Sequence, residues 1–261
     1  MRKNTNSLSV TTINNHLGTP FIELLSVDST NNYAMQMVHK GLASHGTAYF
    51  AHGQFKGKGQ RSKEWYSDPG ENIVLSVVLN TSSLQVSHPF SLSATIALGV
   101  YDFFKNYALS NVSVKYPNDL YWCDRKAAGI LIENIFRGRS WQWAVVGIGV
   151  NINQTKFHSS VINAVSLKQI TGKTYQPAEL AKELCKYLEK RYNQLFVHEA
   201  ELLRKDYNSV LYKQGELVHL KKENTVFEAL IKEVNSNGQL VVQVDDDEQV
   251  YNAGEIEWMI T

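Results

Sequence analysis

The pattern of apolar residues changes once along the chain, near Gln214-Gly215, and this change limits the folds open to it. Before this point, apolar runs typical of strands alternate with long stretches whose apolar residues repeat at helical spacing. After it, short segments of alternating apolar and polar residues are separated by turn sequences such as Asn235-Ser-Asn-Gly238. We therefore expect an α+β domain, with a mixed β-sheet and packed helices, followed by a small β-barrel domain.

The expected elements of the larger domain are strands over 21–27, 47–52, 72–79, 130–136 and 141–150, and helices over 33–38, 90–107 and from Pro177 onward. The near-continuous apolar character of the strands indicates a sheet that helices cover on at least one face. Strands of the small domain are expected over 216–220, 226–232, 239–244 and 249–252. We expect domain limits at 19–212 and 213–261, preceded by a flexible arm over residues 1–18, which is rich in Asn, Ser and Thr.

The composition excludes several classes of partner. Lys and Arg total 26 against 25 Asp and Glu, so no overall charge draws the protein to DNA or to an anionic membrane. No apolar run is long enough to span a bilayer, and the N-terminus lacks the apolar core of a secretory signal. Two distant cysteines, and histidines without ligand spacing, argue against a bound structural metal. We expect a cytoplasmic protein.

Charged residues are concentrated between two apolar runs, in Lys115-Tyr-Pro-Asn-Asp119 and Asp124-Arg-Lys126. The Pro117-Asn118 pair indicates a turn, so these groups are expected on a hairpin or tight connection between strands. A lysine presented there can bind a phosphate or activate an acyl group. A solvated turn is the alternative that the segment by itself leaves open.

Two further segments have ligand-binding chemistry. Gly53 to Trp65 contains three glycines and four basic residues, which favour close approach of a phosphate, although it lacks the ending of a P-loop. A mobile surface hairpin is the alternative. Ser29-Thr-Asn31 stands where a strand is followed by a helix, and the N–H groups of a helix N-terminus favour anionic or polar ligands. A plain helix cap is the alternative there.

Taken in order, four segments resemble the biotin protein ligase family: Ser29-Thr-Asn31, Gly57-Lys-Gly59 with Trp65, Lys115-Tyr-Pro-Asn-Asp119 with Arg125-Lys-Ala-Ala-Gly-Ile-Leu-Ile-Glu133, and Gly147-Ile-Gly-Val-Asn-Ile-Asn153. The third is the most specific, being close to the family's Lys-Trp-Pro-Asn-Asp and Arg-Lys-x-x-Gly-Ile-Leu signature. The resemblance covers nearly the whole chain from about residue 20. It implies a catalytic domain like those of class II aminoacyl-tRNA synthetases and biotin ligases, and an SH3-like C-terminal barrel.

Members of this family activate biotin with ATP, release pyrophosphate, hold biotinyl-5′-AMP and transfer biotin to a lysine of a carboxylase's biotin carboxyl carrier domain. The resemblance therefore implies ATP with Mg²⁺ and biotin as substrates, with no tightly bound metal. The implied catalytic residues are Lys126, Lys58 and Asp119. Those implied for biotin are Ser29, Thr30, Asn31, Gln54, Lys58, Gly59, Gln60, Lys126 and Gly129, and those implied for the nucleotide are Lys58, Trp65, Asn118, Lys126 and Asn151.

The sequence departs from the family at Gly57-Lys-Gly59-Gln60, where members usually have Gly-Arg-Gly-Arg, and this puts retention of the intermediate in doubt. About 20 residues precede the first matched strand, fewer than a helix-turn-helix domain needs, so we expect no DNA binding or repressor activity. A lipoate or octanoate ligase and a non-catalytic biotin-binding regulator are the alternative functions. An exposed edge of the sheet is compatible with a homodimer, which the sequence leaves open.

Overall fold

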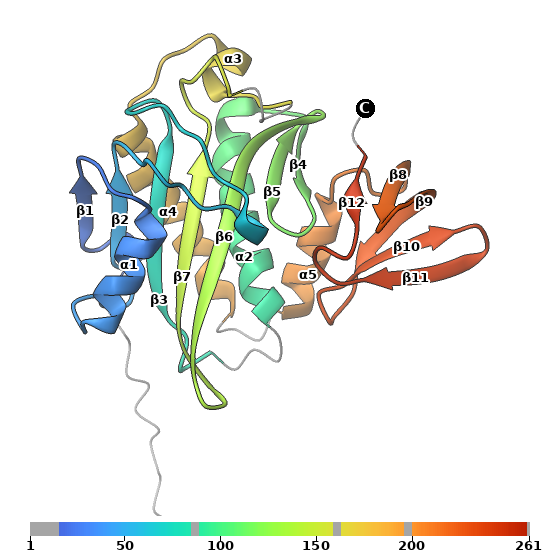
Figure 1. The fold of residues 1–261 in the computed structure, drawn as a ribbon, viewed down its shortest axis with the longest axis horizontal. Coiled ribbons are helices and arrows are strands. Elements are labelled where there is room, and N and C mark those ends of the chain that lie inside the picture. Colours follow the sequence, from blue (N-terminus) through green and yellow to red (C-terminus); the bar gives the residue numbers. More distant parts are fainter. Residues whose placement is uncertain (1–15, 85–88, 159–162, 196–199, 260–261) are drawn as a thin grey trace, which may run out of the picture.

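The computed structural model describes residues 16–84, 89–158, 163–195 and 200–259 (Figure 1). Most of the arm expected over residues 1–18 lies outside the described residues, but Leu17 is buried in the core, so the folded domain includes it. The elements are β1 Phe21–Leu24, α1 Thr30–His39, β2 Ala48–Ala51, the 3-10 turn η1 Gln60–Ser62, β3 Ile73–Asn80, α2 Pro89–Ala108, β4 Val112–Lys115, β5 Asp119–Trp122, β6 Arg125–Arg137, β7 Ser140–Val150, α3 Leu167–Thr171, α4 Pro177–Gln194, α5 Ala200–Ser209, β8 Leu217–Lys222, β9 Thr225–Val234, β10 Leu240–Val244, β11 Asp247–Tyr251 and β12 Glu257–Trp258.

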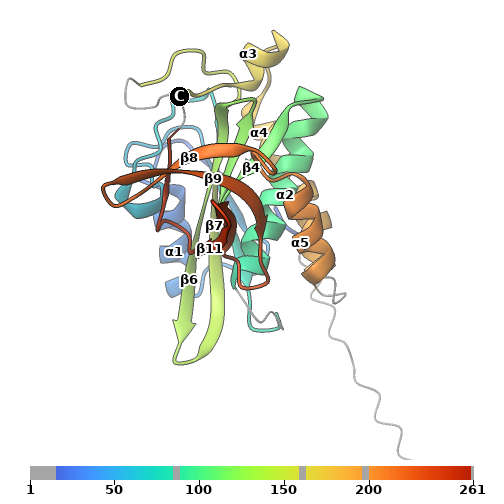
Figure 2. The same ribbon diagram turned by 90° about the vertical axis from the view of Figure 1, so that its right-hand side faces the viewer.

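A seven-stranded sheet in the order β1-β2-β3-β7-β6-β5-β4 forms the centre of the larger domain. Only β1 and β2 are parallel, so the expected mixed sheet and the α+β class are confirmed. Helices α2, α4 and α5 lie on one face and α1 on the other (Figures 1 and 2). Alternate residues of β7 serve the two faces, with Val146 in the main core and Val145 in the cluster under α1.

The charged segment after Val112 forms two successive hairpins and not the single hairpin or tight connection that its sequence indicates. β5 pairs with β4 on one side and with β6 on the other, and Cys123 adopts a left-handed φ of 51° in the exposed turn between β5 and β6. β6 begins at Arg125, five residues before the expected strand, so Lys126 projects from a strand. The charged pair Arg125-Lys126 at its start concealed this part of the strand, because a strand that faces a polar cavity on one side lacks a continuous apolar run.

The C-terminal residues form a second, antiparallel sheet in the order β11-β10-β9-β8-β12, in agreement with the expected SH3-like domain. Two details differ from the sequence-based expectation. β11 begins at Asp247, within residues 245–248 that read as a turn. β12 contains only two residues and carries no alternating pattern, but it pairs with β8 through Trp258 and Leu220.

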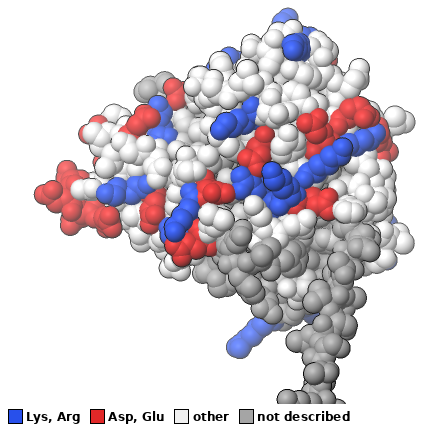
Figure 3. All heavy atoms as spheres, turned by 180° about the vertical axis from the view of Figure 1, so that it is seen from behind, with Lys and Arg blue, Asp and Glu red and all other residues white. Residues whose placement is uncertain are grey.

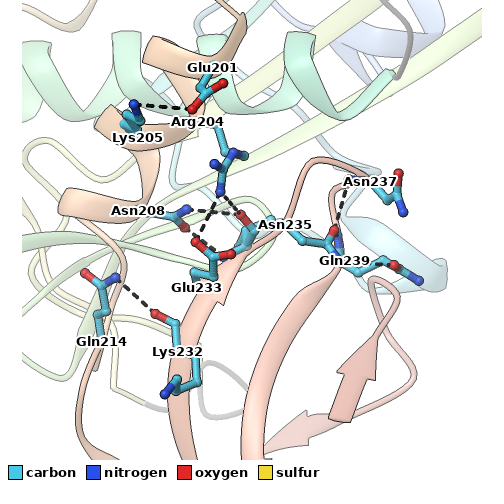
Figure 4. A network of polar contacts seen from close by, with 11 residues as sticks. Glu201, Arg204, Lys205, Asn208, Gln214, Lys232, Glu233, Asn235, Asn237 and Gln239 are labelled. Atoms are coloured by element: carbon cyan, nitrogen blue, oxygen red, sulfur yellow. Dashed lines mark hydrogen bonds and ion pairs between the residues drawn. The ribbon is translucent and has the colours of Figure 1, made fainter. Parts of the chain in front are cut away.

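Polar contacts, those of Asn208 buried, hold the C-terminal domain against α5 (Figure 4). The Asn208 side chain accepts from the Val234 N–H at 2.7 Å and donates to the Val234 carbonyl at 3.0 Å, while Arg204 pairs with Glu233 at 3.1 Å. On the sheet side, the buried Tyr116 hydroxyl donates to the Gly238 carbonyl at 2.8 Å. These contacts place the end of the C-terminal domain that carries β12 beside β4 and β5.

Neither positive nor negative side chains dominate the surface of the face that carries α2, α4 and α5. Basic and acidic side chains are interspersed there (Figure 3), and acidic side chains gather toward the C-terminal domain, where the exposed residues 245–248 of the β10–β11 hairpin are all acidic. Among the described helices, none is both long and apolar enough to cross a membrane.

Candidate active site

A cavity of about 590 Å³ opens on the face of the sheet that carries α1, between the Gly53 to Trp65 segment and the C-terminal domain. The residues proposed from sequence that line it are Ser29, Thr30, Asn31, Gln54, Lys58, Gly59, Gln60, Trp65, Asn118, Asp119, Lys126 and Gly129. The tertiary fold thus brings together segments that are more than 90 residues apart in the sequence. Asn151 alone of the expected residues does not line it.

The start of α1 forms one end of the cavity. Ser29 is the N-cap, with an extended backbone (φ −153°), yet its side chain makes no capping bond, so its hydroxyl remains available to a ligand. The Thr30 N–H donates to the Gln54 side-chain oxygen at 2.9 Å. Asn31 is buried, and its amide oxygen accepts from the Ser76 hydroxyl at 2.6 Å. Backbone and side-chain donors therefore converge on one polar end.

Glycines form the floor of the cavity and let other side chains lie directly on the sheet. A Cβ at Gly147 would stand 2.3 Å from the Asn31 amide oxygen, and one at Gly149 would stand 2.2 Å from the Trp65 indole. A Cβ at Gly129 would also reach Trp65, at 3.0 Å. Since real Cβ atoms do not approach so closely, only glycine permits this arrangement. Asn31 marks one end of the floor and Trp65 the other.

Lys126 and Asp119 form an ion pair in the middle of the cavity. Their side chains project from β6 and β5, and the Lys126 Nζ to Asp119 Oδ2 distance is 2.7 Å. The two side chains are 29% and 24% exposed, so both can reach a bound ligand. The Lys126 ammonium also lies 5.9 Å from the Trp65 ring centre. A bound phosphate would compete with Asp119 for this ammonium and release the carboxylate.

Lys58, which the family resemblance implies to be catalytic with Lys126 and Asp119, forms an ion pair of its own. Its ammonium pairs with Glu133 at 3.2 Å, and the other oxygen of that carboxylate accepts from the Asn31 amide at 2.9 Å. The Lys126 side chain lies close to Gly129, 3.5 Å from where a Cβ would stand there. Glu133 is four residues farther along β6, which corresponds to about 13 Å along a strand. In this structure the charge of Lys58 therefore belongs to the Asn31 end.

Asn151 supports the site from beneath. It is buried, and its amide donates to the backbone carbonyls of Lys126 at 3.3 Å and Val165 at 3.2 Å. This contact holds the backbone of β6 at the point where Lys126 projects. Asn118, by contrast, lines the cavity, and its amide donates to the Ile130 carbonyl.

The C-terminal domain supplies a wall that sequence reasoning missed. Arg61 donates to the Ala253 carbonyl at 2.8 Å, and its guanidinium fills the place that a Cβ at Gly254 would occupy. Ile256, Glu257 and Trp258 also line the cavity, in a segment without any motif. Lys115 was missed as well, although it begins the most specific motif. Within the described ranges, no group of three or more His, Cys, Asp or Glu residues could hold a metal ion.

Comparison with known proteins agrees with this geometry. Residues 24–151 match the family described as Biotin/lipoate A/B protein ligase. The chain therefore contains a domain of that family. The matched region contains all of the expected site residues, since it runs from before α1 to Asn151.

Individual relatives extend the match over both domains. The chain is 33% identical to the bifunctional ligase/repressor BirA of Escherichia coli over 137 residues, which are 52% of this chain and 42% of that protein, so the aligned part is less than half of that relative. It is 27% identical to the biotin–[acetyl-CoA-carboxylase] ligase of Paracoccus denitrificans over 89% of this chain and 98% of that one. The fold is similar to a biotin protein ligase from Aquifex aeolicus in complex with biotin and ATP, with a TM-score of 0.77, 24% identity, and coverage of 92% and 98%.

Proposed function

We propose that this protein is a biotin protein ligase, which joins biotin to ATP and transfers it from biotinyl-5′-AMP to a carrier lysine. The observation that supports this most strongly is the single cavity that unites the polar start of α1, the glycine floor and the Lys126–Asp119 pair. The match along 98% of a biotin ligase from Paracoccus denitrificans favours biotin over lipoate or octanoate.

The bicyclic ring of biotin would lie at the Asn31 end of the cavity. A ureido group needs both donors and acceptors, and the Ser29 hydroxyl, the Asn31 amide and the Gln54 amide supply them there. Thr30, Gly59 and Gln60 complete this part of the lining. The valeryl chain would run from the Asn31 end toward Lys126, above the side chains that the glycine floor allows to lie close to the sheet.

The first step places new negative charge beside Lys126. The biotin carboxylate attacks the α-phosphorus, a bond from carboxylate oxygen to phosphorus forms, and the bond to the pyrophosphate oxygen breaks. The Lys126 ammonium stabilises the charge on the α-phosphoryl oxygens, and no protein nucleophile is needed. Trp65 and Asn118 would contact the nucleotide, and Mg²⁺ would enter with ATP. Lys58, paired with Glu133, would act on the biotin side of this step.

The second step uses the carboxylate that the first step leaves free. Once Lys126 pairs with the phosphate of the intermediate, Asp119 loses its partner and can accept a proton from the ammonium group of the incoming lysine. The neutral amine then attacks the biotinyl carbonyl, an amide bond forms, and AMP leaves. The partner would be the biotin carboxyl carrier domain of acetyl-CoA carboxylase or a related carboxylase.

Exchange of radioactive pyrophosphate into ATP tests this proposal. The purified protein is expected to catalyse exchange with biotin, but not with octanoate or lipoate. Exchange with lipoate or octanoate alone would identify the alternative ligase, and binding of biotin without exchange would identify a non-catalytic regulator. Lys126→Gln is expected to abolish exchange, whereas Lys168→Gln, a lysine on α3 away from the cavity lining, is expected to retain it.

A further inference from the structure

Lys115 stands at the end of β4, where aromatic rings of both domains surround its ammonium. Its Nζ lies 4.9 Å from the ring centre of Tyr121 and 5.5 Å from that of Trp258 on β12, and it donates to the Tyr121 hydroxyl at 3.3 Å. Tyr212 packs against both of those rings, at 5.0 Å and 5.6 Å. The C-terminal domain thus covers a lysine of the catalytic domain, and that lysine lines the cavity.

This ammonium has no counter-ion. Among the described residues, no carboxylate lies within ion-pair distance of Lys115. Burial lowers the pKa of Lys115 to about 8; attraction to Asp119 opposes that change, and repulsion from Lys126 and Lys63 adds to it. Asp119 is itself paired with Lys126 at 2.7 Å. A buried cation among other cations is costly to keep charged, and an anionic ligand would remove that cost.

The strand register places Lys115 away from the biotin end. Asp119 of β5 pairs with Gly129 of β6 on one side and with Lys115 of β4 on the other. Neighbouring strands are about 4.8 Å apart, so the backbone of Lys115 lies roughly 10 Å across the sheet from that of Gly129, beside which Lys126 lies. The polar end at Asn31 lies in a different direction, near residue 133 of β6. Phosphoryl transfer proceeds with attacking and leaving oxygens roughly in line, so the leaving group departs away from biotin.

We propose that Lys115 is a further catalytic residue, which binds the β- and γ-phosphates of ATP and stabilises the departing pyrophosphate. Trp258 is its positioning residue, through which the C-terminal domain contributes to the first step. When the bond from the α-phosphorus to the bridging oxygen breaks, the electron pair goes to the pyrophosphate, and the Lys115 ammonium lies beside that charge without giving up a proton. This inference rests on the proposed function.

The two half-reactions separate this role from a structural one, because biotinyl-5′-AMP has no β- or γ-phosphate. In Lys115→Met, kcat/KM for ATP in biotin-dependent pyrophosphate exchange is expected to fall about 100-fold, as on removal of a donor that stabilises transition-state charge. Transfer of biotin from synthetic biotinyl-5′-AMP to a carrier domain is expected to stay within about twofold of wild type, since no step there uses Lys115.

Matched variants sharpen the test. Lys105 on α2 also lies over a tyrosine ring, 5.2 Å from that of Tyr101, but outside the cavity, and Lys105→Met is expected to leave both half-reactions unchanged. Lys115→Arg retains the charge and is expected to recover part of the exchange. Trp258→Leu removes one ring of the enclosure and is expected to lower exchange about tenfold, with Trp258→Phe closer to wild type.

Two results would overturn the inference: exchange by Lys115→Met within threefold of wild type, or equal loss of exchange and transfer, which would show that Lys115 acts through the fold. Absence of biotin-dependent exchange in the wild-type protein is a different result, because it would refute the proposed function itself.

Discussion

Gly147 and Gly149 lie toward the ends of the cavity proposed to bind biotin and ATP, and alanine at each is expected to weaken binding of a different substrate. Gly147 and Gly149 point to the same face of β7 because side-chain positions alternate along a strand. A Cβ at Gly147 would stand 2.3 Å from the Asn31 amide oxygen, and one at Gly149 would stand 2.2 Å from the Trp65 indole. In each variant the neighbouring side chain must move by about 1 Å to reach ordinary contact.

The magnitude follows from what holds each neighbour. Asn31 makes hydrogen bonds to Ser76, Leu131 and Glu133, so it cannot move without disturbing them. Loss of one or two such bonds costs about 1–3 kcal/mol, which corresponds to a rise of roughly 10- to 100-fold in the dissociation constant for biotin in Gly147→Ala. The Trp65 indole N–H has no hydrogen-bond partner among the described residues, so packing and the Lys126 ammonium near its face hold the ring. Gly149→Ala is therefore expected to raise KM for ATP about tenfold and to leave biotin binding within about threefold of wild type.

Calorimetric titration with biotin, in the absence of ATP, measures the first effect, and pyrophosphate exchange at saturating biotin measures the second. Thermal unfolding of both variants controls for loss of fold. Normal biotin affinity in Gly147→Ala, or the same loss of both substrates in the two variants, would contradict the assignment of the two ends.

Three further outcomes are expected. The Arg191 side chain is 16% exposed and bridges carboxylates of α2 and α5, so Arg191→Met is expected to lower the free energy of unfolding in urea by about 2 kcal/mol, and Arg191→Lys by less; equal stability of all three proteins would show that the bridge contributes nothing. Asn208→Ala leaves the buried N–H and carbonyl of Val234 without their partner and is expected to cost about 2 kcal/mol, whereas the exposed Asn237→Ala is expected to be neutral. Because the pKa of Lys115 is lowered to about 8 and its charged form is the active one, kcat/KM for ATP is expected to fall as the pH rises through 8, and this step in the pH profile is expected to be absent from Lys115→Met.

The two hairpins after Val112 show which features neighbouring residues predict and which they do not. The Pro117-Asn118 turn and the apolar run from Ile130 were correctly located, since both depend on neighbouring residues. The strand between them was missed because its partners, not its own pattern, make Asp119–Trp122 a strand. As a result, Lys126 was expected on a loop, whereas it projects from β6 and lines the cavity.

The sequence by itself predicted many of the chemical groups that line the cavity and their order along the chain, because motifs and apolar periodicity are properties of adjacent residues. Only the tertiary structure decided their neighbours. Lys58 pairs with Glu133, 75 residues away, and Asn151 lies beneath the cavity and not within it. Trp258, in the two-residue strand β12, covers Lys115 of the other domain, and no local sequence pattern predicts this contact. Such contacts form only when separate elements pack together. Their energies depend on burial and on strand register, which cannot be read from neighbouring residues in the sequence.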